Sequence, residues 1–347
     1  MPKPPFYLRY LVLFAFLPLL CTCERAQNAE VEAMPDAPIH KLAGEAMGSY
    51  YRVTYVGDTI PRLKGRIDSL LEAYNLELSA WVPASKLNAF NASDAGISVA
   101  GTDHFIANFE LAKQVSLETE GAYDPTVAPL VKFWGFGTGK KRESADFDRS
   151  EINQLRQLVG LDRIRLEGDF LRKEPGTELD LNASAKGYGV DLISDLLSAA
   201  GRPNHLIDIG GEMRGGGTKN GCRAWNVAIR LPDEDKGKIA RAGTLPLANG
   251  RAIATSGNYL NYYKVDGETF SHTINPKTGL VERNRLLSAS VLAADCATAD
   301  AYATACMVVG PERALELVND RPDLEGYFLV RAEDGGLATL KSDGLEE

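Results

Sequence analysis

The stretch YLNYYKVDGETFSHTI, residues 259–274, decides the fold class of this chain of 347 residues. It contains two runs rich in Tyr, Phe, Val, Thr and Ile, which favour strands, and the pair Asp266-Gly267 between them is typical of a hairpin turn. Two strands joined so closely must be antiparallel, because a parallel pair needs a crossover of a dozen or more residues.

Strand and helix patterns surround this hairpin without the strict strand–helix–strand repeat of a parallel sheet. Further strands are predicted at 50–55, 163–172 (a hairpin), 205–209, 225–231, 251–255 and 286–293. Helices are predicted at 66–79, 103–121, 150–160, 186–200, 297–309 and from residue 311 onward. The chain is therefore expected to be α+β, with mixed, largely antiparallel sheets and packed helices.

The charge and the metal-binding residue types limit the function classes. With 38 basic and 47 acidic residues the net charge is -9, which argues against a protein that binds nucleic acid through a broad basic face. Four histidines and five cysteines offer little for a zinc centre, so a bound metal is expected to have oxygen ligands.

The N-terminus reads as a bacterial export signal. Lys3 and Arg9 precede an apolar run at 10–20, and the sequence LCTC follows at 20–23. Cys23 fits a lipidated cysteine better than Cys21 does, because the bulky Leu20 precedes Cys21. A plain cleaved signal peptide or an uncleaved anchor is the alternative.

These features divide the chain into a lipoprotein signal peptide (1–22), a flexible tether (23–39) and a single folded domain (40–347). Removal of the signal moves the net charge from -9 to -11, so attachment to a membrane must come from the lipid. The protein is expected on a bacterial membrane, facing the periplasm or another extracytoplasmic side. The remaining cysteines, Cys222, Cys296 and Cys306, are an odd number and are interpreted as buried small residues.

Common nucleotide and hydrolase motifs do not fit. GFGTGKK at 135–141 lacks the spacing and the Ser/Thr of a P-loop, and neither G-x-G-x-x-G nor G-x-S-x-G is present.

Other segments do suggest a ligand. A strand is expected to end at Asp180, and the small residues after it lead into a helix start, which favours phosphate. Lys186 would add a charge; a capped helix with a surface lysine is the equal alternative.

Three further features are weak by themselves. Asp300 and Thr304 are four residues apart, so on a helix both oxygens could bind one cation, although such residues often bond to their own helix. His272 is expected on a strand and is either a base or a structural histidine. The aromatic residues near Asp124, which include Phe133 and Trp134, suit a planar ligand.

Taken together, the segments resemble the bacterial ApbE family, the FAD:protein FMN transferases, over about residues 40–335. The resembling strings, in chain order, are AMGS (46–49), AYDPTVAPLVKFWGFG (122–137), DLNASAKGYGVD (180–191), IDIGGE (207–212), ATSGNY (254–259), SHTINPKTG (271–279) and ADAYATA (299–305).

The resemblance implies that FAD is the substrate, that FMN passes to a Thr or Ser hydroxyl of an acceptor protein with release of AMP, and that Mg²⁺ is required. The acceptor would be a protein such as a subunit of a membrane redox complex. The implied FAD contacts are Met47, Trp81, Ala122, Tyr123, Asp124, Asp180, Lys186 and Ile274. The implied metal ligands are Ala183, through its carbonyl, Asp300 and Thr304, and His272 is the implied base.

Two alternatives remain at this stage. The same residues could hydrolyse FAD to FMN and AMP, with water as the acceptor. The chain could also be a lipoprotein that binds flavin outside the cytoplasm without catalysis. Ala303 stands where some family members have an additional acid, which predicts weaker metal binding.

Overall fold

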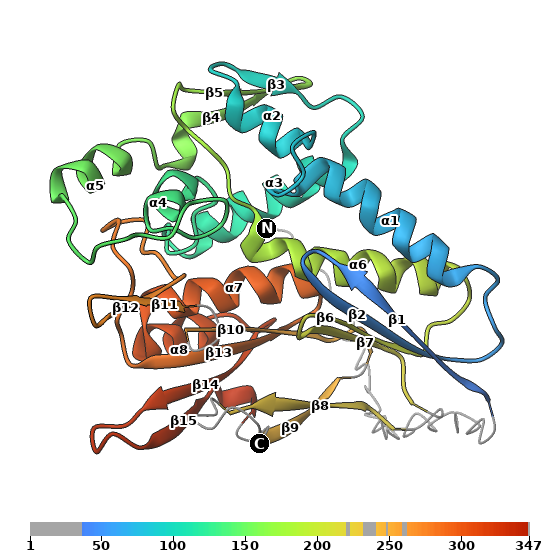
Figure 1. Ribbon diagram of the computed structural model, residues 1–347. Helices are drawn as coiled ribbons and strands as arrows, with labels where there is room; N and C mark the ends of the chain where they lie inside the picture. The colour runs from blue at the N-terminus through green and yellow to red at the C-terminus, as the bar shows by residue number, and fades with distance from the viewer. Residues whose placement is uncertain (1–36, 220–222, 232–240, 248, 259–261, 346–347) are drawn as a thin grey trace, which may run out of the picture. The chain divides into compact units, whose positions relative to one another are not determined.

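The computed structural model describes residues 37–219, 223–231, 241–247, 249–258 and 262–345 (Figure 1). The chain divides into two units, Met1–Glu32 and Ala33–Glu347, and all the described residues belong to the second. The predicted signal peptide, the predicted lipidation site Cys23 and residue Cys222 lie outside the described residues. No helix among the described ranges has the length and apolar character needed to cross a bilayer.

An eight-stranded sheet forms the centre of the fold, and every pair of neighbouring strands in it is antiparallel. Its strands follow one another in the order of the chain: β1 (Ile39–Ala46), β2 (Ser49–Val56), β6 (His205–Ile209), β7 (Glu212–Gly216), β10 (Ala252–Gly257), β13 (Leu286–Ala293), β14 (Glu325–Arg331) and β15 (Leu337–Lys341). The other elements therefore lie in excursions between adjacent strands of this sheet.

The longest excursion connects β2 with β6. It contains α1 (Leu63–Leu78), α2 (Lys86–Ala92), β3 (Gly96–Ser98), α3 (Asp103–Glu118), α4 (Ala128–Phe133), α5 (Arg149–Arg156), η1 (Leu161–Arg163), β4 (Ile164–Glu167), β5 (Phe170–Lys173) and α6 (Asn182–Ala199). Later excursions carry β8 (Trp225–Arg230) with β9 (Arg241–Leu247), β11 (Tyr262–Val265) with β12 (Glu268–Ser271), and α7 (Cys296–Val309) with α8 (Pro311–Asn319). The short η2 (Asp343–Leu345) follows β15.

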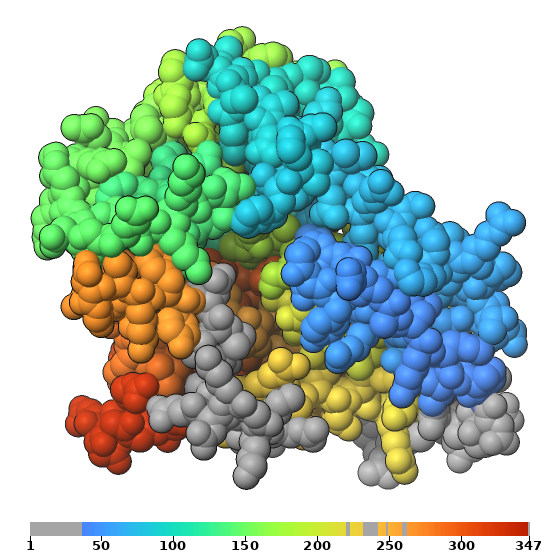
Figure 2. Space-filling model, viewed as in Figure 1, coloured from blue at the N-terminus to red at the C-terminus, as the bar shows by residue number. Residues whose placement is uncertain are grey.

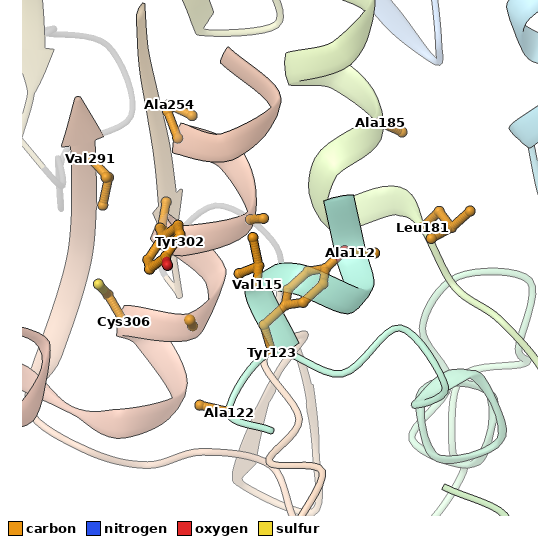
Figure 3. Close-up of a cluster of buried hydrophobic side chains, with 14 of the residues drawn as sticks. Ala112, Val115, Ala122, Tyr123, Leu181, Ala185, Ala254, Val291, Tyr302 and Cys306 are labelled. Atoms are coloured by element: carbon orange, nitrogen blue, oxygen red, sulfur yellow. The ribbon is translucent and has the colours of Figure 1, made fainter. Parts of the chain in front are cut away.

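Helices α6 and α7 lie next to one another between the sheet and the outer helices α1 and α3 (Figure 1). Helix α7 is apolar on nearly all sides, as expected for a helix enclosed by protein. Figure 3 shows Tyr302 and Cys306 of α7 in one cluster with Ala254, Val291 and Val115. Each large apolar side chain buried in this way contributes about 1.5–3 kcal/mol.

The helices α6 and α7 approach so closely that one position between them admits only glycine. A Cβ on Gly187 would lie 2.2 Å from the carbonyl oxygen of Cys296. Gly187 thus allows backbone contact between α6 and α7. These two helices carry the predicted phosphate-binding and metal-binding residues.

The predicted α+β class and the antiparallel character of the sheets are confirmed. Four local predictions need correction. No regular strand ends at Asp180, where Glu178 forms only an isolated bridge to Val127, and α6 begins at Asn182 instead of residue 186. His272 lies just after β12, which ends at Ser271, and β1 begins at Ile39, the last residue of the predicted tether. Cys296 and Cys306 are free and buried, as predicted.

Candidate active site

The AMGS string forms a tight turn between β1 and β2. Ala46 pairs with Ser49, so Met47 and Gly48 are the two central residues of a hairpin loop. Both have positive φ, 54° and 71°, as a type I′ turn requires, and for a methionine this conformation is strained. Its sulfur lies 3.2 Å from the position that a Cβ on Gly189 would occupy. The turn therefore holds Met47, a predicted FAD contact, against α6.

Two of the predicted FAD-binding segments lie side by side. The N–H of Asp180 donates to the carbonyl of Pro125 at 2.7 Å. The hydroxyls of Tyr123 and Ser184 are 3.3 Å apart, so the first turn of α6 is also tied to this segment. The structure thus brings the 122–137 and 180–191 strings together, although 56 residues separate Asp124 from Asp180 in the sequence.

Both aspartates of this pair of segments are fixed by local hydrogen bonds through Oδ1. Asp124 accepts from the N–H and the hydroxyl of Thr126, at 2.8 and 2.6 Å, and Asp180 accepts from the N–H of Asn182 at 2.9 Å. Burial raises the pKa of each carboxyl group, and these hydrogen bonds oppose the rise. The two carboxylates are therefore held in fixed orientations.

Lys186 forms an ion pair with Glu212, the first residue of β7. Burial lowers the pKa of Lys186, but Asp300 and Glu212 outweigh it and raise that pKa above its usual value, so the ammonium stays charged. Glu212 is only 3% exposed, and its Oε2 has no hydrogen-bond partner among the described residues. Glu212 is the last residue of the IDIGGE string, and the sequence predicted no role for it.

Asp300 on α7 faces the same group of charges. Its Oδ2 accepts from the N–H of Gly187 at 3.0 Å. The pKa of Asp300 is raised to about 7, mainly by burial. Lys186 opposes this rise and Glu212 adds to it. Thr304, one turn later and half-buried, has its hydroxyl 3.3 Å from that of Ser256.

The predicted metal ligands suit Mg²⁺ chemically. Ala183, Asp300 and Thr304 supply a carbonyl, a carboxylate and a hydroxyl, and hard cations prefer such oxygens. In a regular helix the carbonyl of Ala183 bonds to the N–H of Gly187, and Asp300 competes for that N–H. Within the described ranges no three His, Cys, Asp or Glu residues come close enough to bind a metal together.

The loop of the SHTINPKTG string lies in the excursion between β10 and β13 and contacts the 122–137 segment. His272 packs edge-on against the ring of Phe136, with 6.4 Å between the ring centroids. Ile274 is buried and bridges to Val281. The next residue, Asn275, shares a cavity of about 450 Å³ with Ala122, which joins this loop to the 122–137 segment.

The aromatic residues near Asp124 do not form the planar-ligand site that their number suggested. Trp134 is fully buried, stacks on Phe270 and donates to the carbonyl of Gly279 at 2.7 Å, so it belongs to the core. Tyr123 is also buried. Phe133 is partly buried and packs edge-on against Trp134. Trp81, which lies outside this group on the loop after α1, is 64% exposed, so a planar ligand can reach it.

Figure 2 shows the molecular face hollowed between the blue β1–β2 hairpin, the cyan and green first excursion, and the orange segment around β11 and β12. Two further polar residues, to which the sequence gave no role, pair with one another. Asp191 ends the 180–191 string and Arg214 lies in β7, and they form a salt bridge at 2.7 Å. Only the pairing of α6 with the sheet brings them together.

Known proteins resemble this chain over most of its length. The model of the ApbE family matches residues 47–328. The FAD:protein FMN transferase of Vibrio cholerae is 34% identical over 94% of this chain and 95% of its own length, and that of Haemophilus influenzae is 31% identical over 90% and 92%. Among solved structures, the flavin transferase ApbE from Vibrio cholerae superposes with a TM-score of 0.80 at 32% identity, covering 90% of this chain and 99% of that one. The apo form of the Pseudomonas stutzeri flavinyl transferase ApbE has a TM-score of 0.78 at 32% identity, covering 89% and 96%.

Proposed function

The chain belongs to the ApbE family, and we propose that it cleaves FAD with Mg²⁺, releases AMP and joins FMN to a Thr or Ser hydroxyl of an acceptor protein. Its enzyme class is that of its relatives, FAD:protein FMN transferase. The observation that carries the proposal is the group of Lys186, Glu212 and Asp300 between α6, α7 and β7.

This group suits the cleavage of a pyrophosphate. The acceptor oxygen forms a bond to the FMN phosphorus while the bond from that phosphorus to the AMP oxygen breaks. Negative charge gathers on the phosphate oxygens, and catalysis of this kind rests mainly on positioning and electrostatic stabilisation. Lys186 is charged and partly exposed, so it can bind one of these oxygens.

The metal site follows from the same group. Ala183, Asp300 and Thr304 would hold Mg²⁺, which when bound would neutralise phosphate charge. Three carboxylates, those of Asp191, Glu212 and Asp300, interact here with two cations, those of Lys186 and Arg214. This excess of buried negative charge favours a cation.

His272 is the proposed base. It would accept the proton of the acceptor hydroxyl as that oxygen attacks phosphorus, a role worth about two to four orders of magnitude in rate. Trp81 and Met47 would contact the flavin, with Ala122, Tyr123, Asp124, Asp180 and Ile274 completing the FAD site.

The test is a reaction of the purified protein with FAD, Mg²⁺ and a Thr-containing acceptor peptide, analysed by mass spectrometry. A peptide that gains the mass of FMN less one water, with AMP in equal amount, supports the proposal. FMN and AMP in solution with an unmodified peptide would instead assign hydrolysis, and unchanged FAD would assign binding alone. The same reaction with EDTA tests the metal requirement.

We also propose that the mature protein begins at a diacylated Cys23 and is anchored to a bacterial membrane on its extracytoplasmic side. The support is the sequence LCTC after a short apolar run, and these residues lie outside the described ranges. Expression in a bacterium with labelled fatty acid should label the parent and not Cys23→Ala. If Cys21→Ala alone removes the label, the lipidated residue is Cys21.

A further inference from the structure

Asp191, at the end of the 180–191 string, binds the first turn of α7 from the neighbouring helix α6. Its Oδ1 accepts from the N–H of Cys296 at 2.9 Å, and its Oδ2 accepts from the N–H of Ala297 at 2.9 Å. An N-terminal helix end has unpaired N–H groups, and a side chain usually satisfies them from the same chain segment. Here a carboxylate 105 residues away in the sequence does so.

An arginine of the central sheet also binds the Asp191 carboxylate. Arg214 of β7 donates from Nη1 to Asp191 Oδ1 at 2.7 Å and from Nε to the carbonyl of Gly250 at 3.1 Å. Asp191 is nine-tenths buried, so its charge depends on these partners. The residue thus connects α6, α7 and the central sheet at one point.

Hydrogen bonds between α6 and α7 recur once per helical turn. Gly187 meets Asp300 at 3.0 Å, and one turn along α6 Asp191 meets Cys296, one turn back along α7. The two helices therefore run antiparallel, and these contacts between them are one turn apart. One turn further in the other direction, the same spacing places Ala183 opposite Thr304.

We propose that Asp191 is a positioning residue for the metal site, because it fixes the register of α7 on α6 and so sets where Asp300 and Thr304 stand relative to Ala183. This inference rests on the Mg²⁺ site of the proposed function. A shift in the register of α7 on α6 would separate ligands that come from the two helices. Mutation of residues that support metal ligands typically lowers metal affinity by about 10- to 100-fold.

Asp191→Asn tests the proposal, since asparagine keeps the size of the side chain and places an amide group against N–H donors. The full-length chain is titrated with Mn²⁺, a paramagnetic substitute for Mg²⁺, and bound metal is measured by electron paramagnetic resonance. We expect Asp191→Asn to bind Mn²⁺ at least about tenfold more weakly than the parent. FAD affinity measured in EDTA should be unchanged, because Lys186 and the FAD contacts remain.

The matched control is Asp295→Ala. Asp295 caps the same helix end, with Oδ1 accepting from the N–H of Thr298 at 2.8 Å, but the bonds it makes stay within α7. Both variants should lower the melting temperature, while only Asp191→Asn should weaken Mn²⁺ binding. An equal loss of Mn²⁺ affinity in both would assign the effect to helix stability and overturn the inference.

Two further outcomes are decisive. A folded Asp191→Asn variant with parental Mn²⁺ affinity overturns this inference alone, whereas a parent chain that binds no Mn²⁺ overturns the proposed metal site and the inference with it. If Asp191→Asn does not fold, Asp191→Glu replaces it, because it keeps the charge that pairs with Arg214 and moves the carboxylate oxygens away from the N–H groups of Cys296 and Ala297. That variant should also weaken Mn²⁺ binding, and unchanged affinity would overturn the proposal.

Discussion

Lys186 of α6 donates to Glu212 of β7, and this ion pair joins two strings that lie 26 residues apart in the sequence. The lysine side chain is 35% exposed, whereas the glutamate beneath it is buried. The pair therefore presents a fixed positive charge at the surface of the site and keeps the balancing negative charge inside.

Lys186→Met should weaken FAD binding by about 10- to 100-fold, since a hydrogen bond to a charged group contributes about 1.5–3 kcal/mol. It should also destabilise the fold by about 1–3 kcal/mol, because Glu212 is left buried without a partner. Isothermal titration with FAD and urea unfolding measure the two effects.

The double variant Lys186→Met/Glu212→Gln separates these effects. It should recover most of the stability, because the buried charge is gone, while FAD affinity stays low. Lys132→Met is the control, since its ion pair with Glu178 is more exposed and should contribute less than about 1 kcal/mol. Recovery of FAD affinity in the double variant would contradict a direct role for Lys186.

Asp300→Asn should abolish Mg²⁺-dependent turnover while the chain still folds. It removes the one carboxylate among the proposed ligands, and a metal's contribution to transition-state stabilisation is several kcal/mol. Circular dichroism establishes folding, and AMP release measures turnover. Parental turnover with Mg²⁺ in a folded variant would show that the metal binds elsewhere.

The contribution of Asp300 to the stability of the metal-free protein should fall as the pH rises from about 4 to about 7. Asp300 has its pKa raised by burial to about 7 in the folded state, against 3.8 for the free side chain, so the folded state binds the proton more tightly. Its contribution is fully present below pH 4 and is lost as the pH passes 7, by at most about 1.4 kcal/mol per pH unit. The pKa of Asp191, raised to about 6 by burial, acts in the same direction.

Urea unfolding at pH 5 and pH 8, with and without Mg²⁺, checks this dependence. The difference between the parent and Asp300→Asn isolates the contribution of Asp300 from that of other groups. Mg²⁺ should stabilise the parent more at pH 8 than at pH 5, because it binds the ionised carboxylate. An equal effect of Mg²⁺ at both pH values would exclude Asp300 as a ligand.

His272→Ala should slow FMN transfer by about two to four orders of magnitude and leave FAD affinity nearly unchanged, as expected for loss of a positioned base. Single-turnover transfer and the FAD dissociation constant are measured on one preparation. His104→Ala is the control, because His104 packs against Tyr74 and Tyr188. Normal transfer by the folded His272→Ala protein would leave His272 a structural role only.

Flavin should bind this chain without a covalent bond, because the proposed product is carried by the acceptor. Denaturation in guanidinium followed by filtration should release all flavin from the purified protein. A flavin adduct that remains on this polypeptide would contradict the proposed direction of transfer.

Local patterns in the sequence predicted many of the strands and helices, but they missed α2, α4, β1, β3, β7, β9, β14 and β15. The strands at 205–209 and 286–293 were predicted with the bounds that the structure has, since alternation and β-branched residues act over a few neighbours. The start of α6 was misplaced because Asn182, Ala183 and Ser184 suit a loop as well as a helix, and contacts with Tyr123 and Asn108 decide between them.

The sequence by itself determined the family, the ordered strings and the residue types of the site, because these are linear properties of the chain. Only the tertiary structure decided that Trp134 belongs to the core, that Glu212 pairs with Lys186 and that Asp191 caps α7. The physical reason is that these depend on burial and on antiparallel packing of segments far apart in the chain. Such contacts form only when the excursions from the central sheet pack against one another, and no local pattern encodes them.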